Sequence, residues 1–181
     1  MSRSMEQILG EMEPYLPTLD EITRSAHKKY RERDPIDHVE FSKRTERSVI
    51  YDYIVLDADK RFSITPDIVP LEVQQLKVWF FSRENVLVRF KRMDESSRTR
   101  NVETVQALAY DAQEELPNFP VAADRLTVGY ILDRTGVNYV TTRIGRPQGK
   151  TWDWCVTIVS EDSRIEGMPI WENPQDQFAF R

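Results

Sequence analysis

The chain has 181 residues, of which 40% are apolar and 30% charged, and its formal net charge is −5. This composition can bury a hydrophobic core and excludes a disordered chain, and the length is that of one ordinary domain. The negative charge excludes a molecule that binds DNA over its whole surface, but it leaves room for a local basic patch.

Cys155 is the single cysteine, which excludes a disulfide framework within the chain and favours a reducing compartment. No apolar run is long enough for a signal peptide or a membrane span, and residues 78–81 (VWFF) are among the longest. We therefore expect a cytoplasmic protein that does not contact a membrane.

The first third of the chain has the periodicity of helices. Ser4 and Gln7 have the spacing of a capping box, and apolar residues follow at helical intervals. The longest helix is expected over residues 39–62, followed by a loop over 63–70. We therefore predict a helical part over residues 1–62.

Residues 71–160 read instead as short strands joined by turns, with one helix over 102–116 that Asn101 would cap. The expected strands cover residues 76–81, 86–93, 126–132, 139–144 and 152–159. The tight turns favour antiparallel pairing. The sequence thus predicts an α+β fold, in which the helices pack on a mainly antiparallel sheet of about five strands. We expect one domain over residues 1–160 and a polar tail over 161–181.

Metal and cofactor chemistry has little sequence support. Two histidines and one cysteine are too few for a zinc site built from these residues, and the six glycines form no phosphate-binding loop. We expect no metal and no cofactor, with Mg²⁺ needed only if the protein is a nuclease. Cys155 lies in an apolar, alternating run, which favours a buried and inert thiol over a nucleophile.

A basic strand and the loop after it form the first candidate site. Guanidinium and ammonium groups neutralise phosphate, and nearby hydroxyl and amide groups donate to the same oxygens. The predicted phosphate-binding residues are Arg89, Lys91, Arg92, Arg98, Arg100 and Asn101. Strand alternation places Arg89 and Lys91 on one face. The alternative is a solvated strand and loop, partly neutralised by Asp94 and Glu95.

Two nuclease patterns are weaker candidates. Arg33 and His38, with Asp34 between them, have the spacing found in small helical ribonucleases of the HEPN class. Asp34-Pro35 is also typical of a position where one helix ends and the next begins. Glu40 or Glu46 on the long helix, with Lys91 on a strand, matches part of a metal-dependent nuclease site. Arg89 stands two residues before Lys91, where such a site needs a carboxylate.

Trp152 and Trp154 are the last candidates. Alternation along a strand predicts that both side chains lie on one face. Packing in the core explains them most simply, and the alternatives are a platform for stacking bases or a contact surface for a protein partner.

Part of the chain resembles a group of uncharacterised bacterial proteins. The resemblance covers about residues 45–155 and is carried by residues 89–94 (RFKRMD), 98–101 (RTRN) and 128–136 (VGYILDRTG), with Leu116-Pro117 between them. Proteins of that group are encoded beside helix-turn-helix regulators, some of them fused to IrrE-like metalloproteases. The resemblance implies the effector half of a toxin–antitoxin or phage-defence module, with a cognate regulator as partner. It carries no catalytic signature.

The sequence therefore favours an effector-like protein that binds a regulator and, through its basic strand and loop, DNA or RNA. A non-enzymatic interaction module that uses an aromatic sheet face is the alternative, and a nuclease is the lesser one. The oligomeric state is left open.

Overall fold

The computed structural model describes residues 3–99, 104–120 and 122–174. Helices precede a sheet, as predicted, and one more helix interrupts the strands. The helices are α1 (Met5–Met12), α2 (Leu16–Arg31), α3 (Pro35–Glu40), α4 (Lys43–Phe62) and α5 (Val105–Asp111). The strands are β1 (Ile68–Val73), β2 (Leu76–Phe81), β3 (Val86–Met93), β4 (Asp124–Leu132), β5 (Tyr139–Gln148), β6 (Thr151–Ile158) and β7 (Trp171–Glu172).

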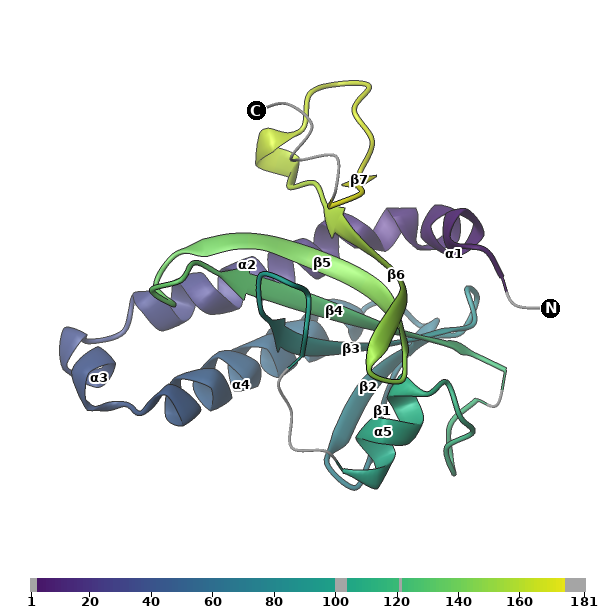
Figure 1. Cartoon of the computed structure of the whole chain (residues 1–181), viewed down its shortest axis with the longest axis horizontal. Coiled ribbons are helices and arrows are strands. Elements are labelled where there is room, and N and C mark those ends of the chain that lie inside the picture. The colour runs from purple at the N-terminus through teal and green to yellow at the C-terminus, as the bar shows by residue number, and fades with distance from the viewer. Residues whose placement is uncertain (1–2, 100–103, 121, 175–181) are drawn as a thin grey trace.

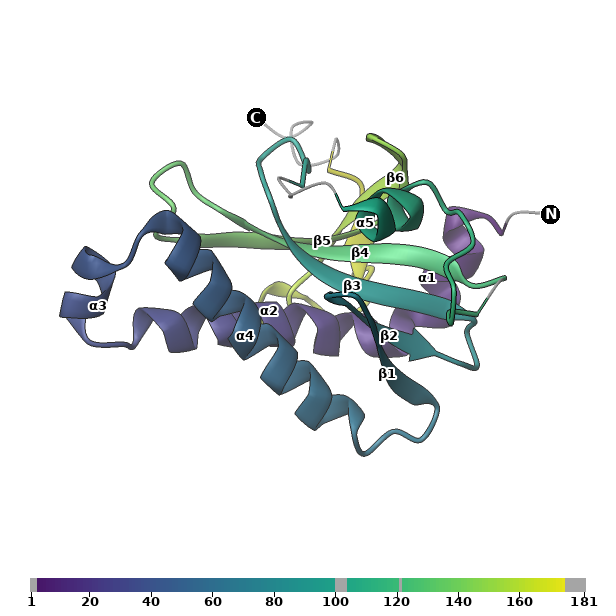
Figure 2. The ribbon, with the colours of Figure 1, turned by 90° about the horizontal axis from the view of Figure 1, so that it is seen from below.

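The strands form one sheet in the order β1-β2-β3-β4-β5-β6-β7. Every neighbouring pair is antiparallel except β3 and β4, which run parallel and are connected through α5. Helices α1, α2 and α4 cover one face, and α5 lies on the other (Figures 1 and 2). The mainly antiparallel α+β fold is thus confirmed.

The sheet is larger than the five strands predicted, because seven are present. β1 begins within the expected loop of residues 63–70 and continues past its end. Its Pro70 is tolerated because β1 is an edge strand, where one side needs no backbone donor. β7 lies in the expected polar tail, where Trp171 packs against the core on the helical face.

Local capping explains where the helices begin. The Ser4–Gln7 capping box is present at α1, as predicted. The single helix expected over residues 39–62 is instead divided, because Phe41 is extended and the Ser42 side chain accepts from the N–H of Thr45 to start α4. Thr104 caps α5, and Asn101, the expected cap, lies outside the described residues.

The main core lies between the helices and the sheet. Edge-to-face contacts join Phe62 of α4 to Trp79 and Phe81 of β2. Asp59 accepts the Trp79 indole N–H at 3.0 Å, so the large ring is buried with its donor satisfied. Among the described residues, no helix is both long and apolar enough to cross a membrane.

A smaller core lies on the opposite face, under α5. Tyr110 is fully buried there, and its hydroxyl lies 2.9 Å and 2.7 Å from the carbonyl oxygens of Leu87 and Leu126. These residues belong to β3 and β4, so Tyr110 packs α5 over the parallel strand pair.

Candidate functional site

The segment after β3, residues 94–99, folds back over the sheet as a closed turn (Figure 1). One carboxylate oxygen of Asp94 accepts from the backbone N–H groups of Ser96 (2.9 Å) and Arg98 (3.0 Å). Ser97 has a φ of 62°, a left-handed conformation that is uncommon for a residue with a side chain. The described part of the basic loop therefore has a definite shape.

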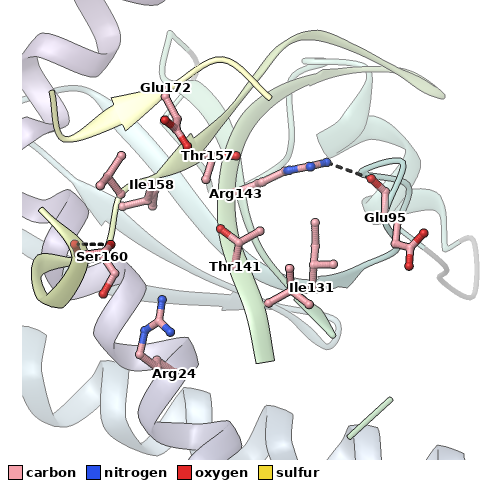
Figure 3. A pocket seen from close by; sticks show the side chains of 12 residues that line it. Arg24, Glu95, Ile131, Thr141, Arg143, Thr157, Ile158, Ser160 and Glu172 are labelled. Carbon is pink, nitrogen blue, oxygen red and sulfur yellow. Dashed lines mark hydrogen bonds between the residues drawn. The ribbon is translucent and has the colours of Figure 1, made fainter. Parts of the chain in front are cut away.

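Side chains from β5 and β6 fasten this turn to the sheet. Arg143 donates to the Glu95 carbonyl at 3.1 Å (Figure 3) and also to the Ser97 hydroxyl. The Trp152 indole donates to the Ser97 carbonyl at 3.0 Å. Cys155 lies beneath the turn and is half-buried rather than fully buried as predicted, and burial raises the pKa of its thiol to about 11.

A pocket of about 310 Å³ opens where β3 and β4 end side by side. Ligand sites often form at the carboxyl ends of parallel strands, because the loops that follow meet there. We call this the arginine pocket, after the four guanidinium groups that line it. They are Arg47 of α4, Arg92 of β3, Arg98 of the 94–99 turn and Arg134 of the β4–β5 turn.

Three carboxylates also line the arginine pocket, but two are engaged in their own turns. Asp133 accepts from the Thr135 hydroxyl and from the amide groups of Asn138, which holds its pKa well below the usual range. Asp94 accepts within its own turn, as described above. Glu95 is mostly exposed and lies 3.6 Å from Arg134, and Arg98 Nε lies 3.3 Å from the second carboxylate oxygen of Asp94. The four guanidinium groups of the pocket therefore outnumber its three carboxylates by one.

Further charge lies beneath the arginine pocket. Arg92 Nη1 lies 3.8 Å from Oε1 of the buried Glu46, whose Oε2 lies 3.1 Å from Lys43 Nζ. A side chain at Gly136 would meet Arg92 and Lys43 at 3.5 Å and 3.8 Å, so the β4–β5 turn passes directly over both cations. Glycine is also suited to this position by its φ of 74°.

The strand residues Arg89 and Lys91 do not reach the arginine pocket. Arg89 is only 1% exposed, forms an ion pair with Asp111 and donates to the Thr127 hydroxyl at 3.0 Å. Tyr110 stacks 4.4 Å from its guanidinium carbon. Burial, together with the charge of Arg89, lowers the pKa of Lys91 to about 8. Both side chains lie on one face of the sheet, as predicted. This is the face that α5 covers, and there Arg89 is already paired with Asp111.

The metal-dependent nuclease arrangement is not assembled. Glu46 contacts Arg92, on the helical face of β3, whereas Lys91 lies on the opposite face beside Arg89. The prediction that paired Glu46 with Lys91 was therefore wrong, because adjacent strand residues point to opposite sides. Within the described residues, no group of three or more His, Cys, Asp or Glu side chains is placed to hold a metal ion.

Arg33 and His38, the HEPN-like pair, each contact other residues. Arg33 donates to the Asp37 carboxylate at 2.7 Å and to the Tyr53 hydroxyl at 2.8 Å. His38 lies 3.3 Å from the Arg31 carbonyl and packs edge-on against Tyr30. In the part of the chain that the structure describes, no contact joins Arg33 to His38.

The two tryptophans do not share a face, contrary to the prediction. A β-bulge shifts the register between Arg146 and Pro147, so that Arg146 pairs with Trp154 but Pro147 pairs with Trp152. Trp154 consequently packs against the helical-face core, whereas Trp152 lies on the other face, beside the 94–99 turn. No aromatic sheet face is formed by this pair.

A larger pocket, of about 470 Å³, lies beside β5 and β6 (Figure 3). Arg24 of α2 and Ser160 line one side, and Glu95 of the 94–99 turn lines the other. It mixes apolar and polar groups without a cluster of one charge.

The sequence identified part of the arginine pocket and missed the rest. Arg92 and Arg98 were predicted to bind phosphate, while Arg100 and Asn101 lie outside the described residues. Arg47 and Arg134 were missed, because each is distant in sequence from the basic loop. The parallel pairing of β3 with β4 brings Arg134 to it, and the packing of α4 on the sheet brings Arg47. Compared with protein-family models, curated proteins and solved structures, the chain matches none.

Proposed function

We propose that this protein binds nucleic acid through the arginine pocket. The observation that supports the proposal is the convergence of four guanidinium groups, from α4, β3 and two turns, on one opening. Arginine is well suited to phosphate, because its planar fork donates two parallel hydrogen bonds and keeps its charge at any physiological pH.

The distribution of charge favours a local rather than a general interaction with phosphate. The whole chain is acidic, with a net charge of −5. Arg47 and Arg134 are nonetheless exposed at the pocket, and Arg47 makes no hydrogen bond or ion pair with another described residue. A focused basic opening on an acidic molecule would orient a polyanion toward one place.

The direct test is binding of a short fluorescent oligonucleotide, followed by anisotropy over a series of salt concentrations. We expect the logarithm of affinity to fall linearly with that of salt concentration, by roughly 0.7–0.9 for each phosphate neutralised. Arg47→Ala with Arg134→Ala should weaken binding at least about tenfold at low salt and reduce the salt slope by roughly one to two.

Lys28→Ala with Arg83→Ala is a matched control. It removes the same charge from two exposed side chains that each have one carboxylate partner and do not line the arginine pocket. The control should bind like the wild-type protein. Equal affinity for the wild-type protein and the Arg47/Arg134 variant would refute the role of the pocket.

The effector role and its regulator partner are a further proposal, supported by the resemblance over about residues 45–155. Tightly controlled expression of the gene alone in bacteria tests it. Arrest of growth by the wild-type protein, and its relief by the Arg47/Arg134 variant, would connect toxicity to nucleic-acid binding. Unaffected growth would remove the stand-alone effector and favour an accessory protein, whose partner a pull-down would seek.

A protein-interaction module is the second candidate, supported by apolar exposure on α5. Val105 is 78% and Leu108 43% exposed. An apolar interface of this kind should respond little to salt, whereas phosphate binding should weaken steeply. The salt series therefore separates the two proposals.

A further inference from the structure

A third pocket, of about 220 Å³, lies on the other side of the 94–99 turn from the β4–β5 turn, and we call it the tryptophan pocket. Its walls come from α5, the 94–99 turn and the β5–β6 turn. The lining residues used below are Arg98, Leu108, Asp111, Lys150 and Trp152. We infer that this pocket receives one unpaired base of a single-stranded nucleic acid. This inference rests on the proposed function, and it adds the class of nucleic acid.

Trp152 is the feature that points to a base. Its indole N–H is fixed on the Ser97 carbonyl at 3.0 Å. The ring also packs on the backbone at Gly145, where an added Cβ would lie 2.8 Å from Cε3. The ring is therefore held in one orientation while it lines an open pocket, so stacking a base on it costs little side-chain entropy. Aromatic rings stack on any base, because every base has a π face.

The rest of the tryptophan pocket has groups that complement a nucleotide. The Asp111 carboxylate is held in place by the buried Arg89 and can accept from an N–H at the edge of a base. Leu108 adds apolar surface at the opening. Arg98 and Lys150 place cations at the same pocket, where a neighbouring phosphate would lie.

Arg98 connects this pocket to the proposed phosphate site, because it lines both the tryptophan pocket and the arginine pocket. A strand whose phosphates lie on the arginine pocket would thus carry a base past Arg98 toward Trp152. A paired base is stacked within its duplex and cannot enter such a pocket, whereas a single strand can turn a base outward. The arrangement therefore selects single strands.

The test compares a single-stranded oligonucleotide with one of equal length built entirely of abasic nucleotides, which keeps the phosphates and removes the bases. The wild-type protein should bind the base-containing strand roughly 5- to 150-fold more tightly, as expected for stacking of one base. It should also bind that strand more tightly than the corresponding duplex.

Two substitutions at one position separate stacking from support of the turn. Trp152→Leu should remove most of the preference for bases, and its affinity for the abasic strand should equal that of Trp152→Phe, because both variants lose the hydrogen bond to Ser97. Trp152→Phe keeps an aromatic face but loses the hydrogen bond to Ser97, and it should retain the preference. If both variants weaken the two ligands equally, Trp152 only supports the 94–99 turn and the inference is wrong.

The outcomes for the wild-type protein distinguish this inference from the proposed function. Equal affinity for base-containing and abasic strands would overturn the base pocket and leave phosphate binding by the arginine pocket in place. Binding to neither strand would overturn both. A preference for the base-containing strand that Trp152→Leu abolishes would establish the base pocket.

Discussion

Arg89 illustrates how the environment decides the role of a charged residue. In the sequence it is one of a run of cations that predicts phosphate binding. In the fold its strand lies under α5, so its guanidinium is buried against Asp111 and Tyr110. A buried charge must be paired within the protein, and a paired charge is not available to a ligand.

Removal of the partner of Arg89 should therefore be costly. Asp111→Ala leaves the guanidinium buried without its counter-charge, and we expect the free energy of unfolding to fall by about 3–5 kcal/mol. Urea denaturation would measure the loss. Glu32→Ala removes a carboxylate from an exposed pair, 4.0 Å from Lys28, and should cost less than about 1 kcal/mol. Similar losses in both variants would contradict this account of Arg89.

His27 is a buried residue beneath the arginine pocket whose charge should matter to stability. Burial, assisted by Arg31, lowers its pKa in the folded protein. Its Nε2 has no hydrogen-bond partner among the described residues. The groups around it are Arg31, Glu46, Arg92, Tyr139 and the backbone of Val137.

The lowered pKa of His27 predicts a dependence of stability on pH. Below an unfolded-state pKa of about 6.5, the unfolded chain binds a proton that the folded chain does not, so stability falls as the pH drops. The contribution of one such group is at most about 1.4 kcal/mol per pH unit. The free energy of unfolding should thus decline less between pH 7 and pH 5 in His27→Gln than in the wild-type protein. Parallel curves would exclude His27 as the cause.

At the scale of elements, sequence patterns predicted those features that depend on local periodicity. The antiparallel pairing of β2 with β3 was correctly predicted, because two apolar runs flank a short polar turn. The parallel β3–β4 pair was missed, since its crossover contains only the short helix α5 and no periodic signal sets strand direction. The bulge that separates Trp152 from Trp154 leaves no mark in the alternation of residues. Half of the arginine pocket was missed for a similar reason, because long-range strand pairing places Arg134 and the packing of α4 places Arg47.

A network of buried polar side chains connects α2 to β5. One of its threonines can be compared with a buried threonine outside the network. The Thr142 hydroxyl donates to Asp20 of α2 and lies 3.1 Å from the Thr23 hydroxyl. Thr157 is equally buried, but its hydroxyl has no partner among the described residues.

Thr142→Val should lower the free energy of unfolding by about 1–3 kcal/mol, because it removes the hydroxyl donor of the buried Asp20 and leaves this carboxylate with Arg24 alone in the described part of the chain. Thr157→Val removes an unpaired hydroxyl of the same shape and should be neutral or slightly stabilising. Thermal or urea denaturation of the two variants would measure the contrast. Equal effects would show that shape alone, rather than hydrogen bonding, governs these positions.

At the scale of the whole molecule, the two faces of the sheet are covered very unequally. Three helices and the larger core lie on one face, while the seven-residue α5 and a smaller core lie on the other. The tryptophan pocket opens on the more thinly covered face, which the 94–99 turn crosses, whereas the arginine pocket lies at the ends of β3 and β4 and takes Arg47 and Arg92 from the helical side. The face with less packing is thus left for the proposed base pocket, and the proposed phosphate site lies where the two strands end.

This asymmetry predicts that the two faces open at different free energies. Regions with few buried contacts exchange their amide hydrogens through local opening, whereas the core exchanges only on global unfolding. Hydrogen–deuterium exchange should therefore be faster in α5 than in α2. Small amounts of urea should accelerate the exchange of α2 more strongly, because global unfolding exposes more surface than local opening does. A single-stranded oligonucleotide should slow exchange at residues 94–99 and in α5, because the tryptophan pocket joins them. Equal protection of α2 and α5 would mean that the sheet and both of its coverings unfold as one unit, and that the binding face has no separate mobility.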